Sequence, residues 1–145
     1  MEFAGRWVTG RMVAYMFEDN FVENEVDVCI VGAGPAGMIL GLLLAHLNIK
    51  VLVLERHKNF EREYRGEVLM PRFTQMLRQL NLLDVIEQYP HLKLKNIDGV
   101  FKNWVIAKIS FEKIFPEVPF AIWMSQPTLL NALYEKAKNY EHFDI

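Results

Sequence analysis

The sequence predicts an α/β fold built around one β–α–β unit near the start of the chain, and three stretches support this prediction. Two are short apolar runs, residues 27–31 and 50–54, in which valine, isoleucine and leucine predominate as they do in the strands of a buried parallel sheet. The third lies between them, at residues 36–47, and has the broad apolar face of a helix that packs on a sheet. A helix between two such strands makes the strands parallel neighbours.

A glycine-rich motif of the form G-x-G-x-x-G joins the first run to the helix, and its residues are Gly32, Ala33, Gly34, Pro35, Ala36 and Gly37. Gly32 allows a tight turn out of the strand, Gly34 lets the backbone approach a pyrophosphate, and Gly37 lets the helix pack closely on the sheet. Pro35 suits the first helical turn, where an N–H group is not needed. The free N–H groups and the positive dipole end of the helix would face the phosphates. The motif therefore predicts a Rossmann-like dinucleotide site.

An acidic residue, Glu55, ends the second run, 18 residues after Gly37. A carboxylate at this position can accept hydrogen bonds from both hydroxyl groups of a ribose, and it repels a 2′-phosphate. The alternatives are a glycine-rich turn in some other α/β protein and a membrane hairpin. Glycines and polar residues interrupt the stretch 28–54 before any apolar span reaches about 20 residues. We therefore expect a nucleotide site and no transmembrane segment.

Composition sets broad limits on the function. The chain has 145 residues, 52% of them hydrophobic, which is enough for one domain with a core. A net charge of −2 gives no electrostatic case for binding nucleic acid. Cys29 is the only cysteine, so we expect no disulfide framework, no metal site and a reducing, cytoplasmic location. We expect residues 1–25 to be a poorly ordered N-terminal extension without a signal peptide, and residues 26–145 to be a partial domain.

The remaining chain reads as a charged loop followed by alternating helices and strands. We expect the loop at 56–67, helices at 71–80, 83–88 and 126–138, strands within 97–114 that turn near 102–103, a strand at 120–124, and the start of a third parallel strand at 143–145. The predicted fold is thus a βαβ unit with added helices and a small β hairpin.

Over roughly residues 26–140 the sequence resembles the single-component FAD-dependent aromatic hydroxylases, the p-hydroxybenzoate hydroxylase class of flavoprotein monooxygenases. The glycine motif is similar to the FAD fingerprint of that family, and Glu55-Arg56 resembles the end of its second strand. Arg65, in the stretch 65–69 before Pro71, resembles an arginine that lies against the FAD ribose and pyrophosphate. Gln126 resembles a glutamine that contacts the same part of FAD.

The resemblance implies FAD as the cofactor, NAD(P)H as the electron donor, and O2-dependent hydroxylation of a small organic substrate by the intact oxidoreductase. The family's later Gly-Asp motif has no counterpart here, because no Gly-Asp pair follows Gln126. We therefore expect an FAD-binding portion that is incomplete relative to the family fold, without a catalytic residue and inactive alone. A second chain could complete its sheet.

Two alternatives to the monooxygenase remain open at this point. The first is a non-catalytic module that binds a nucleotide or docks to a partner. The second is a fragment of an NAD-binding dehydrogenase, because Glu55 would suit the ribose of NAD as well as that of FAD.

Overall fold

The computed structural model describes the backbone of residues 4–8 and 11–15, and both backbone and side chains of residues 25–61 and 68–145. The chain divides into two compact units. Unit 1 comprises residues 1–58 and 133–145, and unit 2 comprises residues 59–132.

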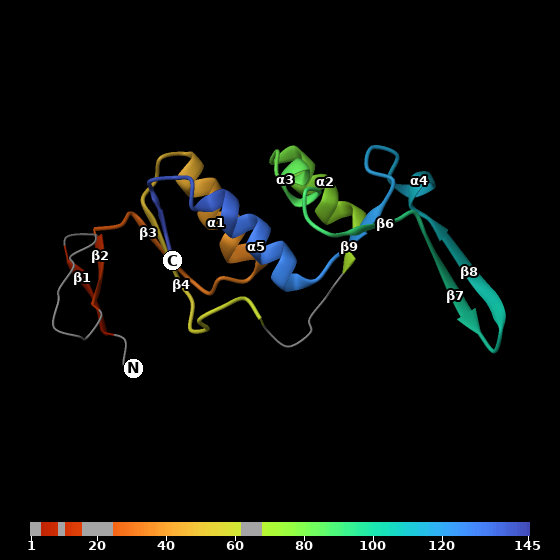
Figure 1. Cartoon of the computed structure of the whole chain (residues 1–145), viewed down its shortest axis with the longest axis horizontal. Helices are drawn as coiled ribbons and strands as arrows, with labels where there is room; N and C mark the ends of the chain where they lie inside the picture. The colour runs from red at the N-terminus through yellow and green to blue at the C-terminus, as the bar shows by residue number, and fades with distance from the viewer. Residues whose placement is uncertain (1–3, 9–10, 16–24, 62–67) are drawn as a thin grey trace. The chain divides into compact units, whose positions relative to one another are not determined.

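Unit 1 contains a parallel sheet of three strands, β3 (Val28–Val31), β4 (Val51–Leu54) and β10 (Phe143–Asp144), in the order β10-β4-β3. Helix α1 (Pro35–His46) connects β3 to β4 (Figure 1). The predicted βαβ unit is confirmed, and so is the prediction that the last residues begin a third parallel strand. The expected α/β fold is therefore present.

Helix α1 packs closely on this sheet because Gly41 has no side chain. A Cβ atom at Gly41 would lie 3.0 Å from the Phe143 ring and 3.1 Å from a methyl group of Val53. The α1 side chains buried against the sheet include Met38, Ile39, Leu42 and Ala45. The predicted helix included residue 47, but α1 ends at His46, and Leu47 after it is exposed.

Strand β3 was predicted to be buried on both faces, and this prediction is wrong, because Val28, Cys29 and Ile30 are only half-buried and Val31 is 83% exposed. The reason is that β3 forms one edge of the three-stranded sheet, and Val31 is its last residue before the glycine turn. In the central strand β4, Val51 and Val53 are fully buried, whereas Leu52 and Leu54 are half-buried.

The N-terminal region contains a β hairpin, which the sequence analysis did not predict. Strands β1 (Ala4–Val8) and β2 (Arg11–Tyr15) pair in antiparallel register from Ala4 opposite Tyr15 to Val8 opposite Arg11. Both segments carry aromatic or β-branched residues that favour strands. The expectation of a poorly ordered tail therefore does not describe these two segments.

Unit 2 is built on an antiparallel sheet in which β9 (Ala121–Trp123) lies between β5 (Val68–Leu69) and β6 (Leu92–Leu94). Helices α2 (Pro71–Gln79) and α3 (Leu83–Ile86) match the two predicted helices within a few residues. The sequence pattern predicted β9 but not the two short edge strands, which are too brief to show alternation. The buried side chains of this unit include Leu77, Ile86, Phe111, Ile122 and Leu130.

A second hairpin of unit 2 consists of β7 (Asn96–Phe101) and β8 (Trp104–Ser110), drawn as the two long antiparallel arrows in Figure 1. Lys102 and Asn103 form its turn, and both have a positive φ, as a tight hairpin turn requires. The predicted turn is thus confirmed. Strand β8 ends at Ser110 and does not continue to residue 114, because α4 (Phe111–Ile114) follows it and buries Phe111.

Helix α5 (Gln126–Ala137) matches the predicted C-terminal helix, and its first part up to Ala132 belongs to unit 2. Its apolar residues Leu129, Leu130, Leu133 and Ala137 are buried as expected. The predicted surface pair between Glu135 and Lys138 is present, with 2.5 Å between the Oε2 and Nζ atoms. Among the described residues, no helix is both long and apolar enough to cross a membrane.

Candidate nucleotide site

The site lies where strands β3 and β4 end together. Val31 pairs with Leu54 in the parallel register, so the residues that follow them, Gly32 and Glu55, leave the sheet side by side. The N–H of Gly32 donates to the carbonyl oxygen of Leu54 over 2.8 Å, and Gly32 has a φ of +106°. Only glycine adopts this backbone conformation without strain. The carboxyl ends of parallel strands are the usual place for a ligand in this class of fold.

Gly34 and Gly37 have opposite environments. A Cβ atom at Gly37 would overlap the carbonyl oxygen of Gly32, so this position holds α1 against the turn. Among the residues that the structure describes, and apart from its two chain neighbours, a Cβ atom at Gly34 would meet no atom within 4 Å. The space beside Gly34 is therefore open, and a ligand could reach the backbone there.

The start of α1 leaves backbone donors without a side-chain cap. Gly34 is the N-cap residue, Pro35 occupies the first helical position, and the first turn carries no acidic residue. The N–H of Met38 donates to the carbonyl oxygen of Gly34. The N–H groups of Ala36 and Gly37 precede the first intrahelical donor, and helix geometry gives them no partner within the helix. This end of α1 therefore suits a phosphate group.

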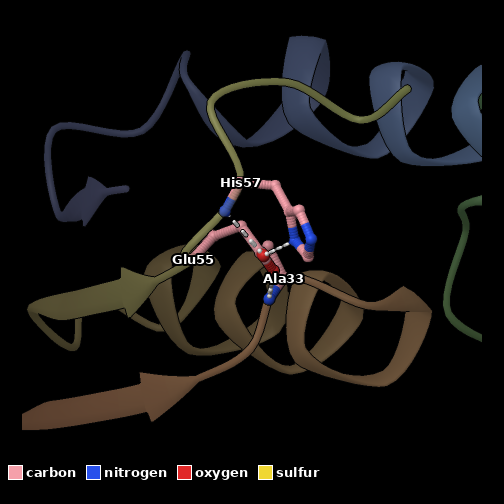
Figure 2. Close-up of polar contacts among 3 residues, drawn as sticks. All are labelled: Ala33, Glu55 and His57. Carbon is pink, nitrogen blue, oxygen red and sulfur yellow. Dashed lines mark hydrogen bonds and ion pairs between the residues drawn. The ribbon is translucent and has the colours of Figure 1, made fainter. Parts of the chain in front are cut away.

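The Glu55 carboxylate is tied to the glycine turn and to its own loop, as Figure 2 shows. Its Oε2 accepts a hydrogen bond from the N–H of Ala33 over 2.9 Å. Its Oε1 accepts from the N–H of His57 over 3.1 Å and lies 2.7 Å from the Nδ1 atom of the His57 ring. The Glu55 side chain is only 9% exposed. These contacts fix the carboxylate against the glycine turn at Ala33.

The other predicted cofactor residues, Arg56, Arg65 and Gln126, are not among the residues that the structure brings together at the glycine turn. Arg56 is exposed in the bend after β4, one residue beyond Glu55. Arg65 lies outside the described residues. Gln126 is half-buried and is the first residue of α5 in unit 2. The structure thus brings together the glycine motif and Glu55, whereas the contacts expected of Arg56, Arg65 and Gln126 stay predictions.

The sequence pattern did not single out two residues whose side chains make defined hydrogen bonds, His57 beside Glu55 and Ser125 before α5. His57 was read as part of a charged loop, although its place two residues after a strand-ending carboxylate was a usable signal. Ser125 precedes α5, and its hydroxyl oxygen accepts a hydrogen bond from the N–H of Thr128 over 3.3 Å. A serine directly before an apolar-periodic helix is a standard N-cap signal.

Cys29 lies in β3 near the site. It is half-buried, and desolvation by burial raises the pKa of its thiol above its usual value. A thiol with a raised pKa is a weak nucleophile at neutral pH. Cys29 therefore fits a structural role in the strand.

Comparison with known proteins identifies the fold. Residues 25–145 match the family model described as the FAD binding domain. The chain belongs to the FAD binding domain family. The glycine turn, the uncapped start of α1 and the Glu55 carboxylate fit the adenosine and pyrophosphate parts of FAD, because they offer backbone donors, open space and ribose-hydroxyl acceptors.

Two curated relatives illustrate the likeness. The chain is 43% identical to 6-methylpretetramide 4-monooxygenase of Streptomyces rimosus over 60 residues, which cover 41% of this chain and 14% of that protein. It is 30% identical to squalene epoxidase 4 of Arabidopsis thaliana over 125 residues, which cover 85% of this chain and 24% of that protein. The chain therefore spans less than a quarter of the length of either relative.

Among solved structures, p-nitrophenol 4-monooxygenase from Pseudomonas putida DLL-E4 shares the fold with a TM-score of 0.74 at 22% identity. The match covers 81% of this chain and 30% of that one. This member of the FAD binding domain family thus has the fold of part of a flavin monooxygenase, as the sequence resemblance implied.

Proposed function

We propose that this chain holds the adenosine and pyrophosphate half of FAD in a flavin-dependent monooxygenase. The observation that carries the proposal is the space beside Gly34, which no described residue fills; Gly34 begins α1 without a side-chain cap, and its neighbour Ala33 is hydrogen-bonded to Glu55. The backbone donors at the start of α1 suit the pyrophosphate, and the Glu55 carboxylate suits the ribose.

The proposed roles follow from the chemistry of each residue. The backbone from Gly32 to Gly37 lies along the pyrophosphate, and Glu55 accepts the ribose hydroxyl groups. Arg65 supplies positive charge to the pyrophosphate, since a guanidinium group can make forked contacts to phosphate oxygens. Arg56, directly after Glu55, and Gln126, at the start of α5, contact the same half of the cofactor. These last three roles rest on the sequence resemblance.

In the intact protein, the bound flavin supplies redox chemistry, with NAD(P)H as electron donor, O2 as oxidant and a small organic molecule as substrate. The named functions of the relatives, a monooxygenase and an epoxidase, support this class of reaction. We expect the chain alone to have no hydroxylase activity, because it spans only 30% of the solved monooxygenase. Its sequence also favours a cytoplasmic location.

The test is retention of flavin by the purified chain. FAD is added, unbound flavin is removed by desalting, and the absorption spectrum is recorded; a parallel titration uses NAD. We expect FAD to bind more tightly than NAD, and Arg65→Ala to weaken FAD binding while Arg62→Ala in the same loop does not. Tighter binding of NAD would favour the dehydrogenase alternative, and binding of neither nucleotide would refute the proposal. Substrate-dependent oxidation of NAD(P)H by the chain alone would refute the expected inactivity.

A second candidate function is docking to another chain. It is favoured by the exposed edge of the parallel sheet at β3, where Val31 is largely uncovered. An unpaired strand edge presents N–H and carbonyl groups that can pair with a further strand. Light scattering of the purified chain tests this candidate. A monomer at all concentrations would exclude docking between copies of this chain. Formation of a complex would then require a different partner.

A further inference from the structure

We infer that His57 is a positioning residue for the carboxylate that recognises the ribose. Its backbone N–H and its ring both donate to Oε1 of Glu55, and together with the N–H of Ala33 on Oε2 they fix the plane of the carboxylate (Figure 2). The inference rests on the proposed FAD site and assigns a role to a residue that the resemblance does not include.

The hydrogen-bond chemistry defines the state of the His57 ring. An ionised carboxylate can only accept hydrogen bonds, so the Nδ1 atom at 2.7 Å from Oε1 must carry a proton. The tautomer of a neutral histidine is set by the hydrogen bond that the ring makes. In the absence of Glu55, nothing in the described contacts of His57 would favour the proton on Nδ1.

Burial explains why the carboxylate needs this support. The Glu55 side chain is 9% exposed, whereas the His57 side chain is 43% exposed. A carboxylate withdrawn from water is costly unless hydrogen-bond donors replace the lost water molecules. His57 supplies two of these donors from the solvent side, and Ala33, which is fully buried, supplies one from the turn.

Pre-organisation connects this contact to ligand binding. A glutamate side chain has three rotatable bonds, and ordering it only when the ligand binds would reduce the affinity. The loop bends after β4 so that residue 57 reaches back to residue 55, which holds the side chain ordered before binding. The effect should therefore appear in recognition of the ribose hydroxyl groups and not in folding.

The first experiment observes the ring without any nucleotide. Long-range proton–nitrogen NMR of histidine-labelled chain, at a pH where the ring is neutral, should show the His57 proton on Nδ1. In Glu55→Ala the proton should move to Nε2. A His57 ring that already carries its proton on Nε2 in the wild-type chain would overturn the inference.

The second experiment measures discrimination between ADP and 2′-deoxy-ADP, which differ only in one ribose hydroxyl group. We expect the wild-type chain to prefer ADP by about tenfold, as for a hydrogen bond to a charged acceptor. His57→Ala should reduce this preference to about twofold, and His57→Asn, whose amide N–H can replace Nδ1–H, should restore most of it.

His46→Ala is the matched control, because His46 is exposed, makes one side-chain hydrogen bond to Tyr140, and lies at the opposite end of α1 from the turn. It should leave both affinities unchanged. Equal discrimination by wild type and His57→Ala would overturn the inference while leaving the proposed function intact. Binding of neither ADP nor FAD by the wild-type chain would overturn the proposed function and the inference with it.

Discussion

The backbone N–H of Ala33 donates to Oε2 of Glu55 over 2.9 Å, and this hydrogen bond joins residues 22 positions apart. Ala33 is fully buried in the glycine turn. The carboxylate proposed to bind the ribose is thus also the acceptor for a buried donor of the loop proposed to bind the pyrophosphate. Folding of the turn and recognition of the ligand share one side chain.

We therefore predict that Glu55→Ala lowers both stability and FAD affinity. The buried Ala33 N–H would lose its acceptor, which costs about 1–3 kcal/mol of unfolding free energy. FAD affinity should fall at least about tenfold, because the ribose hydroxyl groups lose a charged acceptor. Denaturant titration and flavin fluorescence measure the two effects. Glu61→Ala, an exposed glutamate of the following loop, should change neither.

Alanine substitutions at Gly34 and Gly37 should affect ligand binding and folding separately. Gly37→Ala should destabilise the chain by about 1–3 kcal/mol, because its Cβ atom would overlap the Gly32 carbonyl oxygen. Gly34→Ala should cost about 1 kcal/mol or less, since its Cβ atom meets only open space and alanine is merely a weaker N-cap residue. Yet Gly34→Ala should weaken FAD binding strongly by filling that space. Unchanged FAD binding by a folded Gly34→Ala variant would show that the pyrophosphate does not approach there.

The raised pKa of the Cys29 thiol should make the free energy of unfolding depend on pH. Burial raises the pKa of its thiol in the folded chain, so the unfolded chain ionises first as the pH rises. The contribution of the thiol to stability is therefore complete below the pKa of the unfolded chain and is lost as the pH rises through the higher folded value. Iodoacetamide at pH 8 should alkylate the folded chain more slowly than the unfolded chain in urea, because the thiolate is the reactive form. Equal rates would contradict the burial of Cys29.

The β7–β8 hairpin exposes large hydrophobic side chains, and we predict that they bind hydrophobic molecules. Phe101 pairs with Trp104 across the strands, and their side chains are 60% and 77% exposed. The double variant Phe101→Ser/Trp104→Ser should reduce binding of a hydrophobic dye and self-association, and change the unfolding free energy by about 1 kcal/mol or less. Dye fluorescence and light scattering provide the measurements. Serine substitutions at the cross-strand pair Asp98 and Lys108 are the control, and they should leave dye binding unchanged.

The sequence predicted the site-bearing part of the fold because its signals are local. Apolar runs, glycine spacing and Pro35 each act within a few residues, and they located β3, α1 and β4 nearly to the residue. Pro71 and Asn81 lie at the limits of α2, and Asn81 has a positive φ of 55° just after the helix. Such features depend on steric preferences that the rest of the chain does not alter.

Exposure was less predictable, because it depends on what covers each element. Val31 has the sequence of a buried strand residue, but it lies at a sheet edge. Strand β8 carries apolar residues, yet its residues Trp104 to Ile109 are all exposed. Periodicity identifies an apolar face, but it does not identify a neighbour for that face.

By itself, the sequence determined that this chain carries a βαβ unit with a glycine turn and a strand-ending Glu55, and its resemblance to flavin monooxygenases agreed with the FAD binding domain family. The tertiary structure decided which donors meet at that carboxylate. The hydrogen bond from Ala33 depends on the register between β3 and β4, and the contact from His57 depends on the path of the loop after β4. Both are set by packing between segments distant in sequence or by loop geometry, which residue spacing alone does not encode.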